Sequence, residues 1–352
     1  MRFLIILPYL EENGTEKHTF LLSRYLLRAG HQVTVAAPGG PMAAAFQTLG
    51  VNLLCLPPLS LGSFWSAMRR SQAVAKNVDL VHVHAAQEIC GGIRLTGYRG
   101  PLVFTAHCYH SEIDYAKAGL FLNPFCQRVI AVSKTERERL ARFGVKRLVT
   151  IWNGIDLEPG ASSNRSAARA ARKLSDDLVV AIAVGRLARP KRLDILLRAM
   201  VKADCRVHAW IIGDGPAEHY LRALAKQLKI EERVIFWGRQ TAIASWFAAA
   251  DIYVSASQRE GLSLAALEAM SAGLPLVLSD IPEFREIAKN GHAGLFFPTG
   301  QPAALAANLS LLAQQRSLRA RLGEAARAAS ITFSWERMGR ETLELYRAAC
   351  QG

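Results

Sequence analysis

The chain alternates, along nearly its whole length, between short apolar runs rich in β-branched residues and longer stretches with helical spacing of apolar residues. Parallel strands need a crossover connection, usually a helix, so this alternation predicts parallel sheets covered on both faces. The first half has expected strands at 3–7, 32–36, 52–56, 80–84, 102–106, 128–132 and 148–151. The second half has expected strands at 178–184, 206–212, 233–236, 252–254 and 275–278.

The length of 352 residues favours two domains over one. A segment rich in proline, glycine and serine begins at Glu158 and separates the two groups of strands, so we expect a linker there. The predicted fold class is α/β, with two doubly wound, Rossmann-like domains facing each other across a cleft, where ligands bind in such folds. The expected boundaries are an N-terminal domain at 1–157, a linker at 158–175, a C-terminal domain at 176–333 and a last helix at 334–352.

The composition is that of a folded chain without a membrane-spanning segment. Apolar residues make up 51%, and no apolar run approaches the roughly 18 residues that a bilayer span needs. The opening apolar run stops at Pro8 and is followed by Glu11 and Glu12, so it fits a first strand better than a signal peptide. The six cysteines form no close pair, which indicates a reducing, cytoplasmic compartment.

A basic turn follows the first strand of the second half. Arg186, Lys191 and Arg192 surround Pro190, a residue suited to the first turn of a helix. Cations at a helix N-terminus are unfavourable against the helix dipole unless an anion lies between them. One interpretation is a solvated basic turn. The other is a clamp for phosphate or diphosphate, formed by the forked guanidinium of Arg186 and the ammonium group of Lys191.

Two glutamates eight residues apart follow the strand expected at 252–254. Glu260 falls in a loop, and Glu268 falls inside a helix that begins near Ser263. The first turn of this helix contains no acidic residue, so its free N–H groups can bind an external anion. The two carboxylates can accept hydrogen bonds from sugar and ribose hydroxyls.

These donor-site elements, together with the tail at 269–277, resemble the signature of the family-4 retaining glycosyltransferases, which have the GT-B fold. Further segments resemble the family's landmarks and occur in the same order along the chain. The first differs from the family pattern because Asn13 replaces a glycine, although Gly14 is present. These segments are Asn13-Gly-Thr-Glu16, Asp79-Leu-Val-His-Val-His84, Thr105-Ala-His107, Ala131-Val-Ser133, Asn153-Gly-Ile-Asp156 and Gly213-Asp-Gly-Pro216.

The resemblance implies a role for each matching residue. Arg186 and Lys191 neutralise the departing nucleotide diphosphate, Glu260 holds donor-sugar hydroxyls, and Glu268 accepts hydrogen bonds from the ribose. His107 binds the donor sugar from the opposite domain, and the last helix crosses back onto the N-terminal domain. The expected catalytic residues are therefore His107, Arg186, Lys191 and Glu260. The expected nucleotide-sugar ligands are Gly14, Arg186, Lys191, Gly213, Gly261, Leu262, Ser263, Leu264 and Glu268.

No cofactor and no metal are expected. An Asp-x-Asp motif is absent, and the two cations of the basic turn can replace a metal at the diphosphate. The donor is a nucleotide diphosphate sugar, with a UDP-sugar favoured. The loop at Gly213 lacks the full G-x-G-x-x-G of a dinucleotide site. Four histidines, at 82, 84, 107 and 110, fit substrate contacts or core packing better than metal ligation.

The formal net charge of +14 is concentrated in the first half. Residues 128–147 contain seven Lys or Arg against two Glu, and residues 61–76 combine Trp65 with Arg69 and Arg70. One interpretation is that 61–76, with the apolar loop 115–125 and the basic stretch up to 147, docks on an anionic membrane. The other is an ordinary covering helix with Trp65 in the core. No nucleic-acid module is recognisable, so nucleic acid is not an expected partner.

The sequence thus predicts a retaining, metal-independent glycosyltransferase. The expected acceptor is a cell-envelope glycan or a lipid-linked acceptor, as in lipopolysaccharide, exopolysaccharide or glycolipid synthesis. The expected location is the cytoplasm, with peripheral binding to the inner membrane. Two alternatives remain: a GT-B enzyme of non-transfer chemistry such as a sugar-nucleotide epimerase, and a non-catalytic basic protein that binds membrane or nucleic acid.

Overall fold

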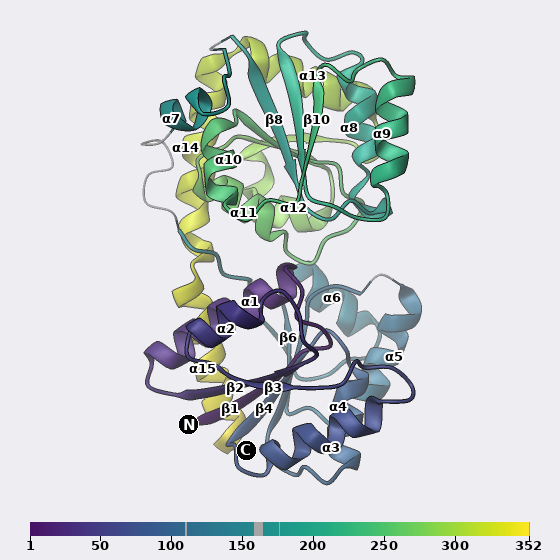
Figure 1. Ribbon diagram of the computed structural model, residues 1–352, viewed down its shortest axis with the longest axis vertical. Coiled ribbons are helices and arrows are strands. Elements are labelled where there is room, and N and C mark those ends of the chain that lie inside the picture. The colour runs from purple at the N-terminus through teal and green to yellow at the C-terminus, as the bar shows by residue number, and fades with distance from the viewer. Residues whose placement is uncertain (110, 158–164, 176, 352) are drawn as a thin grey trace. The chain divides into compact units, whose positions relative to one another are not determined.

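The computed structural model describes residues 1–109, 111–157, 165–175 and 177–351 (Figure 1). The chain divides into two compact units. The N-terminal unit comprises Met1–Ile155 together with Phe333–Gly352, and the C-terminal unit comprises Asp156–Thr332. Each is a parallel α/β layer structure, which confirms the predicted fold class.

The N-terminal unit is built on a parallel sheet with the strand order β3-β2-β1-β4-β5-β6-β7. All five residues of β4 and of β5 are buried, as expected for strands covered on both faces. The order places β1 and β4 side by side at the centre, so successive connections run outward in both directions from there. The strands are β1 (Arg2–Ile6), β2 (Gln32–Ala37), β3 (Asn52–Cys55), β4 (Leu80–His84), β5 (Leu102–Ala106), β6 (Arg128–Ala131) and β7 (Leu148–Thr150).

Helices cover both faces of this sheet. One core contains residues of α3 (Phe64–Ala75), α4 (Glu88–Leu95), α5 (Glu112–Leu122) and α6 (Lys134–Arg142). The core of the other face contains residues of α1 (Gly14–Arg28), α2 (Ala43–Thr48) and the C-terminal helix α15 (Trp335–Gln351). Helix α15 lies against α1 so closely that a side chain at Gly339 would overlap Tyr25. The segment 115–125 was expected to be a loop; that expectation is wrong, because most of it is helix α5.

The C-terminal unit repeats the design with the strand order β10-β9-β8-β11-β12-β13. Its strands are β8 (Val179–Val184), β9 (Val207–Ile212), β10 (Val234–Gly238), β11 (Ile252–Ser255), β12 (Leu276–Ser279) and β13 (Gly294–Phe297). Its helices are α7 (Arg165–Ala170), α8 (Leu193–Met200), α9 (Glu218–Gln227), α10 (Ile243–Ala249), α11 (Leu264–Ser271), α12 (Pro282–Ile287), α13 (Pro302–Gln314) and α14 (Arg316–Ser330). Short 3₁₀ turns are η2 (Arg189–Lys191), η3 (Lys289–Gly291) and η4 (Ile331–Phe333). None of the helices among the described residues is both long enough and apolar enough to cross a membrane.

The expected strands are confirmed to within two residues at each end, and one strand was missed. Strand β13 contributes four residues and begins at Gly294, where a side chain would overlap the carbonyl oxygen of Leu276 on the neighbouring strand. A short run that starts with glycine gives little strand signal in the sequence. It is tertiary packing against β12 that makes it a strand.

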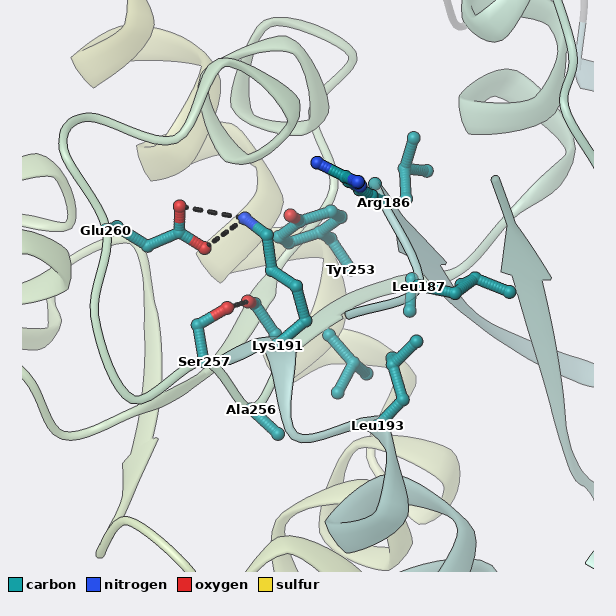
Figure 2. Close-up of a pocket in the computed structure, with 13 residues that line it drawn as sticks. Arg186, Leu187, Lys191, Leu193, Tyr253, Ala256, Ser257 and Glu260 are labelled. Atoms are coloured by element: carbon teal, nitrogen blue, oxygen red, sulfur yellow. Dashed lines mark hydrogen bonds and ion pairs between the residues drawn. The ribbon is translucent and has the colours of Figure 1, made fainter. Parts of the chain in front are cut away.

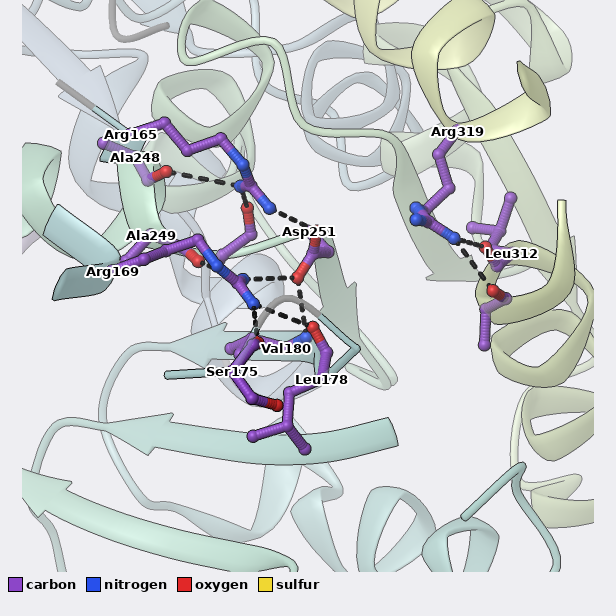
Figure 3. Close-up of polar contacts among 12 residues, drawn as sticks. Arg165, Arg169, Ser175, Leu178, Val180, Ala248, Ala249, Asp251, Leu312 and Arg319 are labelled. Carbon is purple, nitrogen blue, oxygen red and sulfur yellow. Dashed lines mark hydrogen bonds and ion pairs between the residues drawn. The ribbon is translucent and has the colours of Figure 1, made fainter. Parts of the chain in front are cut away.

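Part of the expected linker is folded into the C-terminal unit. Residues 158–164 lie outside the described part of the chain, whereas 165–170 form helix α7. Arg165 and Arg169 of this helix both bind the carboxylate of Asp251, at 2.5 and 3.1 Å (Figure 3). Asp251 also accepts the backbone N–H of Val180 at 2.9 Å. Residues 165–170 of the expected linker therefore pack as a helix on the C-terminal unit, because these arginines have a buried partner far along the chain.

Arg169 extends the network into the backbone. Its guanidinium donates to the carbonyls of Ala249, Ser175 and Leu178, at 3.2, 2.6 and 3.0 Å. The Arg169 side chain is 8% exposed and that of Asp251 is 9% exposed, so the charge pair is nearly dry. A buried charge that loses its partner is strongly destabilising. Asp251 therefore holds α7 onto the strands β8 and β11.

Replacing Asp251 by Ala should destabilise the C-terminal unit by about 3–5 kcal/mol, because Arg165 and Arg169 are left without their carboxylate. In calorimetry this corresponds to a fall of about 6 °C or more in the thermal midpoint of that unit. The control is Glu218→Ala, which removes an exposed helical ion pair with Arg222 and should change stability by less than about 0.5 kcal/mol. Equal midpoints for Asp251→Ala and the control would contradict this role.

Candidate functional site

A pocket opens at the carboxyl ends of β8 and β11. The chain runs from β8 to β9 on one side, whereas β11 lies on the other side of β8, so the strand order reverses here. In open parallel sheets this reversal point is where ligands bind. The residues after the two strands line the pocket together with Lys191 and Glu260 (Figure 2).

An ion pair between Lys191 and Glu260 lies at the centre of this pocket. The ammonium nitrogen of Lys191 is 2.7 Å from Oε1 and 2.9 Å from Oε2 of Glu260, so both carboxylate oxygens are engaged (Figure 2). The Glu260 side chain is 9% exposed, whereas that of Lys191 is 32% exposed. The carboxylate is therefore buried with its countercharge, and the cation remains open to the pocket.

The local backbone explains how these two residues meet. Lys191 ends the 3₁₀ turn η2, in which Pro190 occupies the first turn, and Arg192 then adopts a left-handed conformation before α8 begins. The N–H of Gln258 donates to the carbonyl of Pro190 at 2.9 Å, which ties the loop of Glu260 to the turn of Lys191. The loops after β8 and β11 are thus joined by a backbone hydrogen bond as well as by the ion pair.

Arg186 lines the same pocket from the loop after β8. Its side chain is exposed, and no hydrogen bond links its guanidinium to any residue in the described part of the chain. A forked guanidinium without a protein partner can bind an anionic ligand through two N–H groups. Two cations, Arg186 and Lys191, therefore line one pocket.

Glycines bring the neighbouring loop into place. Gly185 and Gly213 both have positive φ, at 147° and 129°, and a side chain at Gly213 would overlap the carbonyl oxygen of Gly185. The N–H of Leu187 also donates to the carbonyl of Asp214 at 2.7 Å. Gly213 thus supports the pocket loop through packing and is not itself one of the lining residues.

Helix α11 begins beside the pocket. Ser263 is its N-cap and accepts the N–H of Ala266 at 3.4 Å, and its first turn contains no acidic residue. Glu268 lies in the second turn and is partly exposed. Of the residues expected to bind the nucleotide sugar, the structure groups Arg186 and Lys191 with the catalytic candidate Glu260. The other expected ligands on α11 and in the loop before it do not line the pocket; they are Gly261, Leu262, Ser263, Leu264 and Glu268.

Some lining residues were not singled out from the sequence. Tyr253 is buried within β11, and its burial together with the negative charge of Glu260 raises the pKa of its hydroxyl. Ser255 and Ser257 also line the pocket, with their hydroxyl oxygens 3.1 Å apart. Their position at the carboxyl end of a predicted strand was the available signal.

The N-terminal unit carries a cluster of histidines at the carboxyl ends of β4 and β5. His84 Nδ1 and His107 Nε2 are 3.0 Å apart, and the ring of His18 from α1 lies 5.0 Å from that of His107. His82 bonds to the hydroxyls of Tyr346 and Thr105, at 2.5 and 2.7 Å, which is the expected core-packing role. His18 was not singled out from the sequence, and His110 lies outside the described residues.

Burial sets the protonation of this cluster. It lowers the pKa of His18 to about 4 and the pKa values of His82, His84 and His107 well below the usual range, with neighbouring rings adding to the effect for the last three. All four imidazoles are therefore neutral at neutral pH.

Glu16, in the first turn of α1, is another buried titratable group of the N-terminal unit. Its Oε1 accepts the N–H of Glu11 at 3.3 Å, and its Oε2 has no partner among the described residues. Burial raises the pKa of Glu16 from 4.5 to about 7, and the charge of Glu11 adds to this, although backbone hydrogen bonds oppose it. The folded chain holds this proton more tightly than the unfolded chain, so the group's contribution to stability is lost as the pH rises from 4.5 through about 7.

Replacing Glu16 by Gln should therefore stabilise the N-terminal unit at about pH 8 by up to about 3 kcal/mol, because the amide keeps an acceptor and carries no charge. The gain should vanish near pH 4.5, below which both forms are neutral in either state. Calorimetry at several pH values measures it, with the exposed Glu138→Gln as the control. A gain that is constant with pH would show that ionisation of Glu16 is not its cause.

Two Rossmann-like units of this kind, one with a pocket at its topological reversal point, make up the GT-B fold. Residues 12–159 match the family described as Glycosyltransferase Family 4, and residues 164–329 match Glycosyl transferases group 1. The chain belongs to these family-4 glycosyltransferases, as the sequence motifs predicted.

Two named relatives are similar to this chain over most of its length. The chain is 26% identical to the phosphatidyl-myo-inositol mannosyltransferase of Mycobacterium tuberculosis, covering 98% of this chain and 96% of that protein. It is also 26% identical to the N-acetyl-alpha-D-glucosaminyl L-malate synthase of Bacillus anthracis, over 89% and 87% of the two chains. The crystal structure of Anabaena HepE in complex with UDP-glucose has the same fold, with a TM-score of 0.89 and 21% identity over 99% and 100% of the chains.

Proposed function

We propose that this protein is a retaining, metal-independent glycosyltransferase that uses a nucleotide diphosphate sugar, with UDP as the favoured nucleotide. The observation that carries the proposal is the convergence of Arg186, Lys191 and Glu260 in the pocket between β8 and β11. Two cations match a diphosphate, and a carboxylate beside them can accept hydrogen bonds from sugar hydroxyls. Complexes of HepE contain UDP-glucose, which supports a UDP-sugar for this chain.

The Lys191–Glu260 ion pair indicates how binding of the donor changes the pocket. Without a ligand, Lys191 neutralises Glu260. An entering diphosphate offers Lys191 and Arg186 a stronger anion, and the carboxylate of Glu260 then becomes available to the hydroxyls of the donor sugar. In the transition state the bond from sugar to phosphate breaks and negative charge grows on the leaving diphosphate, so fixed cations stabilise it without a metal.

Retention fits the position of Glu260 as a hydroxyl ligand. Both of its carboxylate oxygens bond to Lys191 before the donor binds. Once Lys191 turns to the diphosphate, the same oxygens accept hydrogen bonds from the donor-sugar hydroxyls, which makes the carboxylate a poor nucleophile. A front-face attack by the acceptor, assisted by the leaving phosphate, explains retention without a covalent sugar intermediate. His107 remains a predicted ligand of the donor sugar, and Gly14 and Glu268 remain predicted ligands of the nucleotide sugar.

We expect Lys191→Ala and Glu260→Ala each to lower transfer by at least about tenfold in kcat/KM, equal to about 1.4 kcal/mol of barrier. Lys202→Ala, which removes an exposed lysine of the same unit, is the matched control. The donor is found first by thermal shift with UDP-, GDP- and ADP-sugars, because a bound ligand raises stability by mass action. Transfer that survives both pocket substitutions would refute the site assignment.

The same assay separates the alternatives. An epimerase turns over the sugar nucleotide without an acceptor and inverts a carbon of the donor, whereas a transferase releases a nucleotide diphosphate and retains the anomeric configuration in its product. NMR of the product reports both. A non-catalytic protein releases no nucleotide with any acceptor.

A membrane-bound acceptor is the second part of the proposal, and exposed apolar side chains on one face of the N-terminal unit support it. Trp65 of α3 is 49% exposed, so the alternative with Trp65 in the core is wrong. Ile113 and Leu120 of α5 are 66% and 72% exposed. Helices α3 and α5 both pack on α4, and Arg69 and Arg70 are exposed beside Trp65.

Basic side chains extend this surface toward 147. The exposed cations of α6 and the following loop are Lys134, Arg137, Arg142, Lys146 and Arg147. Aromatic and aliphatic side chains mixed with Lys and Arg are typical of surfaces that bind anionic lipid. The relative that is named as a phosphatidyl-myo-inositol mannosyltransferase supports a lipid-linked acceptor, in the envelope or glycolipid class.

The triple variant Trp65→Ala, Arg69→Ala, Arg70→Ala should bind phosphatidylglycerol vesicles at least about tenfold more weakly than the natural chain, because each cation near an anionic surface contributes about 1 kcal/mol. Co-sedimentation measures this, with phosphatidylcholine vesicles as the neutral comparison. The matched control is Tyr220→Ala, Arg222→Ala, Lys226→Ala, which removes an aromatic residue and two cations from α9. If both triple variants bind equally well, α3 is not the anchor.

A further inference from the structure

We infer that the N-terminal unit contains a binding site for one divalent transition-metal ion of the zinc class, formed by His18, His84 and His107. Each histidine offers one ring nitrogen, and these three atoms all lie within 4.8 Å of one another. Zinc–nitrogen bonds of about 2.0–2.1 Å in a tetrahedral site require nitrogens about 3.4 Å apart. The facing nitrogens of His84 and His107 are 3.0 Å apart, and the rings must shift to bring all three nitrogens to the tetrahedral spacing.

The hydrogen bond to His18 leaves a nitrogen free for a metal. Its Nδ1 is 2.9 Å from Oδ1 of Asn153, an oxygen that can only accept, so Nδ1 carries the proton and Nε2 has the free lone pair. Metal-binding histidines typically donate their other N–H to such an oxygen, which fixes the tautomer and the ring orientation. The bond to Asn153 therefore fixes the tautomer of His18 that a metal ligand needs, with Nε2 unprotonated.

His84 provides a second, independent observation. Its Nε2 is fully buried and has no hydrogen-bond partner among the residues that the structure describes. Buried polar atoms without partners are rare and costly, and an ion is one of the few groups that satisfies a bare imidazole nitrogen. Either nitrogen of His84 is therefore open to an ion: Nε2 without the loss of any bond, and Nδ1 in place of its bond to His107.

The chemistry of the donors defines the kind of ion. All three ligands are imidazoles, which suit zinc, cobalt, nickel and copper, whereas magnesium, calcium and manganese prefer carboxylate oxygens. The imidazoles are neutral because of their burial, and the neutral form is the one that binds metals. His82 is excluded as a ligand, since both its nitrogens bond to Tyr346 and Thr105.

Three ligands leave a fourth tetrahedral position open. His107 is the least buried of the three, so water or an anion can reach the ion from its side. This site goes beyond the proposed transfer reaction, in which the ion has no part. Because His107 is also the predicted ligand of the donor sugar, the ion and the sugar compete for the same ring.

The test uses the full chain with every purification tag removed, equilibrated with zinc or cobalt and analysed without donor or acceptor. Elemental analysis should find about one ion per chain, and bound cobalt should show the intense visible bands of tetrahedral coordination. His18→Ala and His84→Ala should weaken binding at least about tenfold, and Asn153→Ala, which removes no ligand, should also weaken it by about tenfold. The control is His219→Ala, which removes an exposed histidine of the C-terminal unit and should leave binding unchanged.

Two outcomes would overturn the inference. One is a natural chain that retains far less than one ion at micromolar zinc. The other is binding that persists equally in His18→Ala, His84→Ala and Asn153→Ala, with calorimetry showing that these variants are folded. Since no sugar nucleotide is present, neither outcome depends on whether the transferase assignment is correct.

Discussion

The parallel pairing of the strands is the constraint on which everything else in this molecule depends. Every described strand pair in both sheets is parallel, so the loops that follow the strands gather at one edge of each sheet. In the C-terminal unit, that edge brings Lys191 and Glu260 together although 69 residues separate them. In the N-terminal unit, it places His84 and His107 on adjacent strand ends. In both units, the topology of the sheet decides which residues meet, and their side-chain chemistry then decides what they can bind.

The two edges solve the problem of buried polarity in opposite ways. The C-terminal edge keeps full charges and neutralises them in pairs, as with the 9% exposed carboxylate of Glu260. The N-terminal edge removes charge: its four histidines are neutral, and the raised pKa of Glu16 favours its proton. An anionic ligand is therefore attracted to the first edge through its cations. The second edge offers neutral lone pairs, which suit hydroxyls and soft cations rather than phosphates.

The sequence predicted most of what depends on local pattern and on short motifs. Alternation of strands and helices was enough for the fold, and Arg186, Lys191 and Glu260 were found because glycine and proline residues mark their loops. Strand β13 was missed since a four-residue run beginning with glycine has almost no local signal. Helix α7 was assigned to the linker because the partner of its arginines, Asp251, lies more than eighty residues later in the chain. His18 was missed for the same reason, as its partner Asn153 is 135 residues away.

The Lys191–Glu260 pair also shows why the site could not be derived in full from its motif. The sequence placed Glu260 in a loop and Glu268 in a helix, and the structure adds what each contacts: Glu260 lies in the pocket against Lys191, whereas Glu268 lies on α11 outside the lining. The difference arises at Ser263, where the chain changes from loop to helix. A loop carboxylate can be buried against a cation brought by another loop, but a carboxylate in the second helical turn points where the helix directs it. The backbone also separates the cations of the basic turn. Arg192 pairs with Asp194, a residue of the helix that follows it. Lys191 ends the 3₁₀ turn, whereas Arg192 adopts the left-handed conformation that follows it. This change of backbone conformation directs the Lys191 side chain into the pocket and the Arg192 side chain away from it.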